Sequence, residues 1–132
     1  GRLSGYKALA LVSIHADSCQ FINDQATGFK VAGSEAGTAA EASQYLTGCL
    51  RARYADRTHL SFHGESITRD MTGYHSFNEL DAATPAAIIE IGFLYMDRDF
   101  LLRHSDLVAQ GIAEGILCFT RNEPLEFSTP TP

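Results

Sequence analysis

The chain has 132 residues, of which 45% are hydrophobic and 20% charged, and its formal net charge is −6. This length and composition fit one globular domain with a single hydrophobic core. Ten Lys and Arg residues are scattered along the chain, so there is no basic stripe that could neutralise a phosphate backbone, and nucleic acid is excluded as an expected partner. The longest apolar stretches, residues 8–14 and 85–91, are far shorter than the ~20 residues that span a membrane, so no membrane-spanning segment is expected.

The first half of the chain predicts two strands and a helix. Residues 7–16 form a nearly continuous apolar run, which is typical of a parallel strand covered on both faces. Residues 17–28 are rich in Asp, Ser, Asn, Gln and Gly and predict a loop, and residues 29–32 predict a short second strand. Apolar residues then recur at helical spacing over residues 35–54, which predicts an amphipathic helix.

The middle of the chain is the hardest part to assign. Residues 56–81 contain two glycines, three histidines and no sustained period. We expect a loop there, with a short strand near Ile67 and a short helix near Phe77. Residues 85–93, PAAIIEIGF, then predict a second buried strand because of their β-branched run.

Two helices and a tail complete the predicted elements. Asp97 can cap a short helix through Arg103, and Ser105 can cap a longer one to about Thr120. Residues 123–132 contain three prolines and predict a Pro-rich tail or linker. Apolar strands alternating with helices predict an α/β fold, with a mixed, mostly parallel sheet flanked by helices.

The three cysteines are Cys19, Cys49 and Cys118, and none has CxxC spacing. Their odd number excludes complete pairing within the chain, and their spacing argues against a structural zinc knuckle. Cys49 and Cys118 lie in helical apolar patterns, so we expect both to be small buried hydrophobic residues. Cysteine usage therefore does not predict a redox compartment.

Two residues in the predicted strands could carry chemistry. His15 is at the carboxyl end of the first strand, where open α/β sheets gather ligand-binding groups, although such a residue is often an ordinary surface or core histidine. Glu90 lies among isoleucines, where burial raises a carboxyl pKa and so suits a general base. The alternative for Glu90 is a side chain at the sheet rim that faces water or pairs with an arginine.

The segments that contain these two residues resemble a known enzyme family. SIHAD at residues 13–17 and PAAIIEIGFL at residues 85–94, with MDRD just after, are similar to motifs of the zinc-dependent N-acetylmuramoyl-L-alanine amidases. In that family a strand ending in SIHA(N/D) supplies a histidine zinc ligand, and a later strand ending in E-x-G-F supplies the catalytic glutamate. The resemblance runs to about Arg121 and implies His15 as a metal ligand and Glu90 as the catalytic residue.

The resemblance also implies a further part of the domain. The family binds zinc through two histidines and one glutamate, and the first histidine and the glutamate precede the SIHA(N/D) strand. Residues 1–6 are too short to contain that portion, and no glutamate occurs before Glu35. Because a catalytic zinc site needs about three protein ligands, we expect residues 1–122 to be the C-terminal portion of an amidase catalytic domain. An upstream segment or second chain would supply the other ligands and complete the sheet.

Other candidate site residues are weaker. His59 and His63 have i, i+4 spacing, but neighbouring Thr, Ser and Gly residues disfavour a helix, so we expect solvated loop histidines rather than metal ligands. His75 could line a substrate groove or be an ordinary loop residue, and His104 is expected to be structural. Asp17 could orient the His15 ring, although an Asp just after a strand more often caps the following turn.

The implied activity is zinc-dependent hydrolysis of the amide between N-acetylmuramic acid and L-alanine in peptidoglycan, at the cell envelope in the periplasm or outside the cell. Peptidoglycan is then the expected partner, without nucleic acid or a membrane span. One alternative is a non-catalytic binding or structural subunit that keeps the fold and has lost the metal. Another is an unrelated α/β domain with chance motif matches.

Overall fold

A computed structural model of the chain describes residues 4–126. The predicted Pro-rich tail therefore lies outside the described residues from position 127 onward. The elements in chain order are β1 (Leu11–Asp17), β2 (Lys30–Gly33), α1 (Ala40–Thr58), the 3-10 helix η1 (Gly64–Ser66), α2 (Arg69–Thr72), the 3-10 helix η2 (His75–Glu79), β3 (Ala86–Phe93), α3 (Arg98–Arg103) and α4 (Ser105–Thr120).

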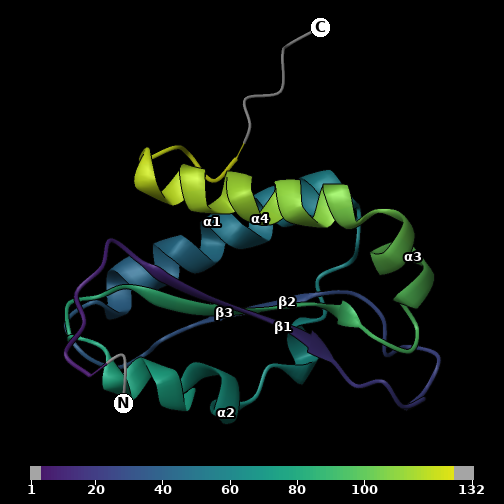
Figure 1. Cartoon of the computed structure of the whole chain (residues 1–132), viewed down its shortest axis with the longest axis horizontal. Coiled ribbons are helices and arrows are strands. Elements are labelled where there is room, and N and C mark those ends of the chain that lie inside the picture. The colour runs from purple at the N-terminus through teal and green to yellow at the C-terminus, as the bar shows by residue number, and fades with distance from the viewer. Residues whose placement is uncertain (1–3, 127–132) are drawn as a thin grey trace, which may run out of the picture.

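The three strands form one mixed sheet in the order β1-β3-β2. β3 is central, pairing in parallel with β1 and antiparallel with β2. Figure 1 shows the arrowheads of β1 and β3 pointing to the same end of the sheet, the end beside α3. The predicted α/β fold with a mixed sheet between helices is confirmed.

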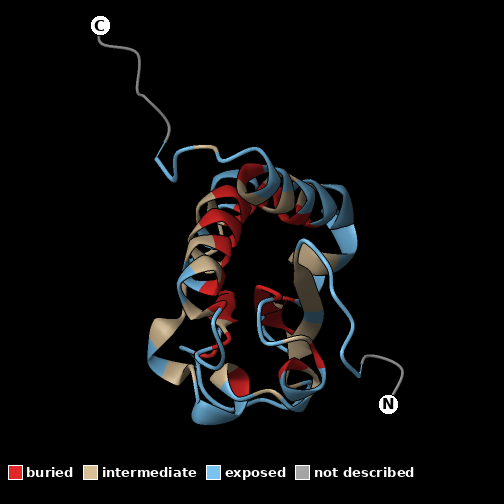
Figure 2. Ribbon diagram, turned by 90° about the vertical axis from the view of Figure 1, so that its left-hand side faces the viewer, coloured by how far each residue is buried: buried red, intermediate tan, exposed pale blue. Residues whose placement is uncertain are grey.

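Helices cover the two faces of the sheet unequally. The long helices α1 and α4 lie together over one face, and the short α2 lies on the opposite side (Figure 1). In Figure 2 the buried residues of α1, α4 and the sheet are gathered on the inside of the molecule. This arrangement follows from the alternation of side chains along a strand, which sends successive residues of β3 to opposite faces.

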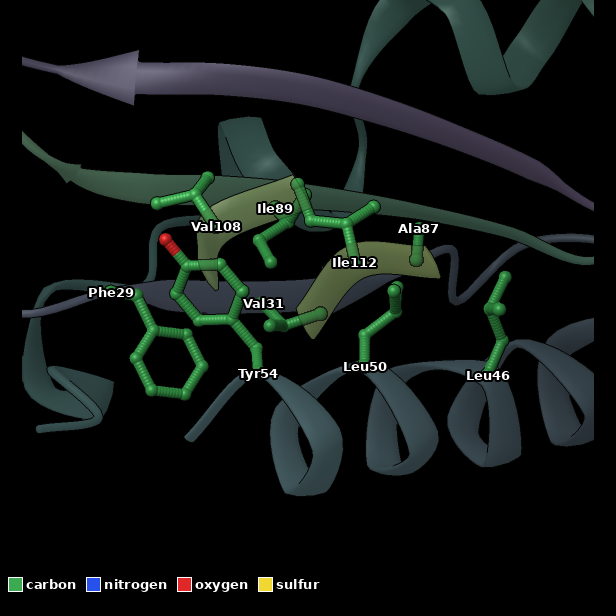
Figure 3. Packing of buried hydrophobic residues seen from close by; sticks show 9 residues of the cluster. All are labelled: Phe29, Val31, Leu46, Leu50, Tyr54, Ala87, Ile89, Val108 and Ile112. Carbon is green, nitrogen blue, oxygen red and sulfur yellow. The ribbon is translucent and has the colours of Figure 1, made fainter. Parts of the chain in front are cut away.

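The larger core lies between the sheet and the pair α1 and α4. Its nine buried members come from β2, β3, both long helices and the residue before β2, and Figure 3 shows them in contact: Phe29, Val31, Leu46, Leu50, Tyr54, Ala87, Ile89, Val108 and Ile112. Leu46, Leu50 and Ile89 are completely buried. Burial of one such side chain contributes about 1.5–3 kcal/mol to folding, so this cluster is the main source of hydrophobic stabilisation.

A smaller core covers the opposite face. Ala86 and Ile88 of β3 and Ala32 of β2 pack there against Met71 of α2, Phe77 of η2, and Leu80. These β-strand residues alternate with those of the larger core, as the pleat requires. The sheet residues that continue this face toward its α3 end are polar, and they are described below.

One expectation about the loop region is wrong, and β1 is only partly covered. Ile14 of β1 is 56% exposed. Among the described residues β1 pairs with β3 alone in the sheet, so its outer edge has no strand partner there, in line with the expectation that an upstream segment or second chain would complete the sheet. The strand expected near Ile67 is absent from the described residues around it; the 3-10 helix η1 ends just before, and the neighbouring extended contact is the bridge of Phe62 with Phe29.

Helix α1 begins later and ends later than the sequence pattern predicts. It starts at Ala40 because Gly37 adopts a positive φ of 74° and the Ala39 N–H bonds to the Ala82 carbonyl. It ends where His59 takes the left-handed conformation with φ of 58° and its N–H reaches the Ala55 carbonyl. Side-chain periodicity identified the helical face, but these backbone hydrogen bonds fix its ends.

Cys49 and Cys118 are both completely buried, as expected, but they form a disulfide. The bond joins α1 to α4 across 69 residues of sequence. The expectation that they are merely small hydrophobic residues is therefore wrong: each lies on the apolar face of its own helix, and packing of the two helices brings the thiols together. Cys19 is free and exposed.

The chain after α4 is held against α1. The guanidinium of Arg53, which is 4% exposed, donates to the carbonyl oxygens of Leu125 at 3.0 Å and Pro124 at 2.6 Å. The Tyr45 hydroxyl donates to the Glu123 carbonyl. The first residues of the predicted tail are thus anchored rather than loose.

Candidate active site

A row of polar residues crosses all three strands at the α3 end of the sheet. The Cα of Glu90 in β3 pairs with His15 in β1 and, on its other side, with Lys30 in β2. Residues directly opposite one another on paired strands project to the same face. His15 and Glu90 therefore share the face covered by α2 and η2, as a common site requires.

A β-bulge at this point brings a further strand-end residue to the same face. His15 pairs with Glu90 and Asp17 with Phe93, so two steps along β1 match three steps along β3. The extra residue reverses the alternation on β3, which places Phe93 on the same face as Glu90. The Lys30 ammonium lies 5.0 Å from the centre of the Phe93 ring, in agreement with that orientation.

Two buried side chains hold the bulge in shape. The Tyr54 hydroxyl donates to the Ile91 carbonyl at 2.6 Å. The Asp97 carboxylate accepts the Phe93 N–H at 2.9 Å, and it also accepts the Gly28 N–H at 2.9 Å and the Thr27 hydroxyl. Asp97 therefore ties the end of β3 to the turn that precedes β2.

The role of Asp97 differs from the one predicted. It stands at the N-cap position of α3, but its side chain makes no capping hydrogen bond to that helix. An aspartate can either cap a helix or bind the backbone of a distant segment, and the sequence gives no signal that distinguishes these two roles.

Asp17 forms an ion pair with Lys30 rather than orienting the His15 ring. Its other oxygen accepts the Ser18 N–H at 2.7 Å, which is the turn-capping role weighed for it from the sequence. Burial raises the pKa of the Asp17 carboxyl, but the hydrogen bonds from Lys30 and Ser18 outweigh this, and the pKa lies below its ordinary value. Lys30 is only 7% exposed, so the pair is a fixed part of the site that sequence analysis did not identify.

The His15 ring is oriented by its neighbours in β1 and before η2. The Ser13 hydroxyl lies 2.8 Å from Nε2, and the Tyr74 ring packs edge-on with centroids 5.2 Å apart. Tyr74 also contacts the His75 ring at 4.4 Å. His75, expected as a possible groove residue, is exposed beside this aromatic contact.

The negative charge of the Glu90 carboxylate is only weakly stabilised by its surroundings. Burial raises its pKa, the nearby Asp17 charge raises it further, and His15 and Lys30 act in the opposite direction with smaller effect. Its Oε2 atom is buried and has no hydrogen-bond partner among residues 4–126. Buried polar atoms are nearly always paired, so this oxygen marks a position at which a proton or a bound group would be accommodated.

The remaining histidines differ in their surroundings. His59 is exposed at the end of α1, and His104 precedes α4 with its ring against Phe100 at 5.1 Å. His63 is not a simple solvated loop residue, because both ring nitrogens have partners. Within the described part of the chain no group of three or more His, Cys, Asp or Glu residues could hold a metal ion.

Solved structures with a similar fold include N-acetylmuramoyl-L-alanine amidases. The catalytic domain of CwlV, an N-acetylmuramoyl-L-alanine amidase from Bacillus (Paenibacillus) polymyxa var. colistinus, matches 86% of this chain with 27% identity and a TM-score of 0.61. An N-acetylmuramoyl-L-alanine amidase from Clostridium difficile 630 matches 89% with 22% identity and a TM-score of 0.68. AmiC2 of Nostoc punctiforme matches 86% with 22% identity and a TM-score of 0.61.

These comparisons confirm the resemblance that the sequence motifs predict. The mixed sheet and its flanking helices are similar to those of solved N-acetylmuramoyl-L-alanine amidases. The chain spans 59%, 60% and 59% of the lengths of those three solved structures. No protein-family model matches it, and the search of curated proteins found no match. Over residues 4–126, no helix is long and apolar enough to cross a membrane.

Proposed function

We propose that this chain is part of an N-acetylmuramoyl-L-alanine amidase that hydrolyses the amide between N-acetylmuramic acid and L-alanine in peptidoglycan. The observation that supports it most is the direct pairing of His15 with Glu90 on one face of the sheet. An imidazole and a carboxylate with a raised pKa, side by side at strand ends, are suited to amide hydrolysis. We propose residues 1–122 as the C-terminal portion of the catalytic domain and residues 123–132 as its tail.

Glu90 is the proposed general base and acid. A carboxylate whose pKa is raised by burial holds a proton more readily near neutral pH than an exposed glutamate. Glu90 takes a proton from the attacking water and returns it to the nitrogen of the leaving amine. The unpartnered Oε2 atom is free to accept that proton without breaking a hydrogen bond within the described residues.

His15 is the proposed zinc ligand. A neutral imidazole is a common zinc ligand, and Ser13 and Tyr74 orient its ring. Zinc bound there would polarise the amide carbonyl and lower the pKa of a water molecule. Since residues 4–126 contain no group of three suitable ligands, the other ligands in this proposal come from an upstream segment or a second chain.

The same segment or chain is proposed to complete the sheet along β1. Strand edges with unpaired backbone groups and exposed apolar side chains are commonly covered by another strand or a partner. Ile14 is exposed on β1, and the outer edge of β1 has no sheet partner among residues 4–126.

His75 is proposed to line the substrate groove next to His15, because Tyr74 contacts both rings. The proposed work site is the cell envelope, in the periplasm or outside the cell. Support for that location comes from the Cys49–Cys118 disulfide, since disulfides persist in oxidising compartments and are rare in the cytosol.

The test uses the natural full-length protein and purified cell walls. Glu90→Gln should reduce amide hydrolysis by on the order of 10²–10⁴-fold while bound zinc, measured by metal analysis, stays stoichiometric. His15→Ala should lose both zinc and activity. Glu41→Gln, an exposed glutamate in the first turn of α1, is the matched control and should retain both.

Two results would overturn the proposal. If Glu90→Gln kept most of the wild-type rate, Glu90 could not be the proton-transfer group. If the wild-type protein bound cell walls but contained no zinc and released no peptide, the non-catalytic alternative would replace the enzyme.

A further inference from the structure

A cavity of about 330 Å³ opens beside the polar row, at the strand ends that carry Asp17, Lys30 and Phe93. Its lining includes Lys30, Asp17 and Phe93 at the strand ends, and two loop segments, residues 22–26 and 63–66, form its walls. Lys30 is the Cα partner of Glu90. A substrate that lies across Glu90 would therefore enter this cavity by passing Lys30. The volume falls in the range of about 300–1,000 Å³ that is common for ligand pockets.

His63 holds the two walls together. Its Nε2 lies 3.0 Å from the Gln25 carbonyl oxygen and its Nδ1 lies 2.6 Å from the Ser66 hydroxyl. Because a carbonyl can only accept, Nε2 must carry the hydrogen, and Nδ1 can accept from Ser66. Its ring also packs edge-on against Phe93, with centroids 5.3 Å apart. Both ring nitrogens thus have a hydrogen-bond partner.

Of the two carboxylates that line the cavity, Asp17 is paired with a lysine, whereas Glu65 has no Lys or Arg partner among residues 4–126. Asp17 and Lys30 neutralise each other through their ion pair. Glu65 lies 3.4 Å from Nε2 of His63, but that nitrogen is already directed to the Gln25 carbonyl, and the Glu65 side chain is 75% exposed. Glu65 therefore presents a negative charge at the rim, where a cationic group of a ligand could reach it.

The rest of the lining suits a peptide. The amide side chains of Asn23 and Gln25 can each donate and accept hydrogen bonds, as peptide groups require. Ile22, Ala26 and Phe93 provide apolar surface beside them. Small-molecule sites commonly combine such apolar walls with a few placed polar groups.

We propose that this cavity is a binding subsite for a short peptide that carries an ammonium group, with Glu65 contacting that group. Resting on the proposed function, the ligand is the peptide stem of peptidoglycan, bound through a diamino acid. His63 is a positioning residue that fixes the two walls, and Glu65 determines specificity for the charged side chain.

The test measures binding of released stem peptide, which requires no hydrolysis. The full-length protein, labelled with ¹⁵N, is titrated with the tripeptide L-Ala–γ-D-Glu–L-Lys and with the same tripeptide acetylated at the lysine amine. We expect saturable shifts of the amide signals of Gln25, Glu65 and Ser66. The free amine should bind about three-fold more tightly than the acetylated form, as expected for one exposed ion pair.

Variants at the rim decide whether Glu65 causes the preference. In Glu65→Gln the two tripeptides should bind equally, and in Glu65→Lys the acetylated form should bind more tightly. Glu41→Gln should leave the three-fold preference unchanged. The proposal is overturned if neither tripeptide binds, if the shifts map elsewhere, or if the preference persists in Glu65→Gln.

Failure of this subsite and failure of the proposed function give different results. Hydrolysis of cell walls without tripeptide binding at the cavity would remove the subsite and leave the amidase in place. Tripeptide binding that depends on Glu65, in a protein that does not hydrolyse cell walls, would keep the subsite and remove the enzyme.

Discussion

The two faces of the sheet are built from alternate residues of the same strands, yet they differ in character. On the α1 and α4 side, Ile89, Leu46 and Leu50 are completely buried, and a disulfide joins the two helices. On the α2 side, the smaller core gives way at the strand ends to His15, Glu90 and Lys30.

The comparison shows how one short strand can contribute both to the hydrophobic core and to the polar row. Ile89 and Glu90 are adjacent in sequence, and the pleat sends one to the apolar core and the other to the polar row. Two costly features of Glu90, the raised carboxyl pKa and the buried Oε2 atom without a hydrogen-bond partner among residues 4–126, lie on the second face. The first face supplies the burial that offsets them.

The largest effect that would test this separation is removal of the disulfide. The double variant Cys49→Ala with Cys118→Ala should lower the free energy of unfolding by about 4 kcal/mol, because the bond closes a loop with a sequence separation of 69. Denaturant unfolding measures this loss. Below the unfolding transition, hydrolysis of cell walls should be unchanged, since the bond lies on the face away from Glu90.

Cys19→Ala is the matched control, because Cys19 is free and exposed, and it should change neither quantity. If the double variant lost activity while still folded, the two faces would not be independent.

A change at Tyr54, on the α1 side of the sheet, should have a smaller effect on stability and should also affect the site on the other face. Tyr54→Phe removes the hydroxyl that donates to the Ile91 carbonyl in the bulge, which should cost about 1–2 kcal/mol of stability. Because the bulge orients the end of β3, activity should fall as well. Unfolding curves and initial rates measure the two effects.

Tyr45→Phe provides the comparison, since its hydroxyl bonds to the carbonyls of Cys118 and Glu123 and does not touch the bulge. It should lose stability but keep the wild-type rate. Equal rates for both variants would show that the bulge does not depend on the Tyr54 hydroxyl.

The smallest expected effect is a pH dependence of the free energy of unfolding that comes from Glu90, on the polar face. Burial and Asp17 raise the pKa of Glu90 in the folded state, so between the unfolded and folded pKa values the native state binds more protons than the unfolded state. Stability contributed by this group is therefore lost as pH rises through that window. Relative to wild type, Glu90→Gln should become more stable as pH rises from about 4.

Thermal unfolding in the presence of a chelator, followed over that range, measures the difference between the two proteins. A difference that stayed constant with pH would mean that Glu90 is not desolvated in the folded protein.

Most of the fold could be predicted from the sequence because its signals are local. The apolar run at residues 85–93 and the helical period before Thr120 gave a strand and a helix close to the observed β3 and α4. The ends of α1 could not be predicted, because they depend on a bond from Ala39 to the distant Ala82 carbonyl. The disulfide was missed for the same reason. It depends on how α1 and α4 pack against each other, and the spacing of the cysteines in the sequence does not show this.

The site divides in the same way. His15 and Glu90 could be predicted as site residues because each stands in a recognisable strand-end motif, and the structure places their Cα atoms opposite each other. Lys30 and Asp97 were missed because nothing local distinguishes a lysine that pairs with Asp17 from an exposed one, or a clamp from a helix cap. Their roles depend on segments about 13 and 70 residues apart that meet only in the fold.

The anchoring of the chain by Arg53 has a practical consequence. Because the carbonyls of Pro124 and Leu125 are bound against α1, the backbone leaves the molecule on the side of the long helices, remote from α2 (Figure 1). A fluorophore, an affinity handle or a surface linker attached at Glu126 would start from the side of the long helices rather than from the polar row. Immobilised protein could thus be assayed on large, insoluble cell-wall particles with the row still facing solution.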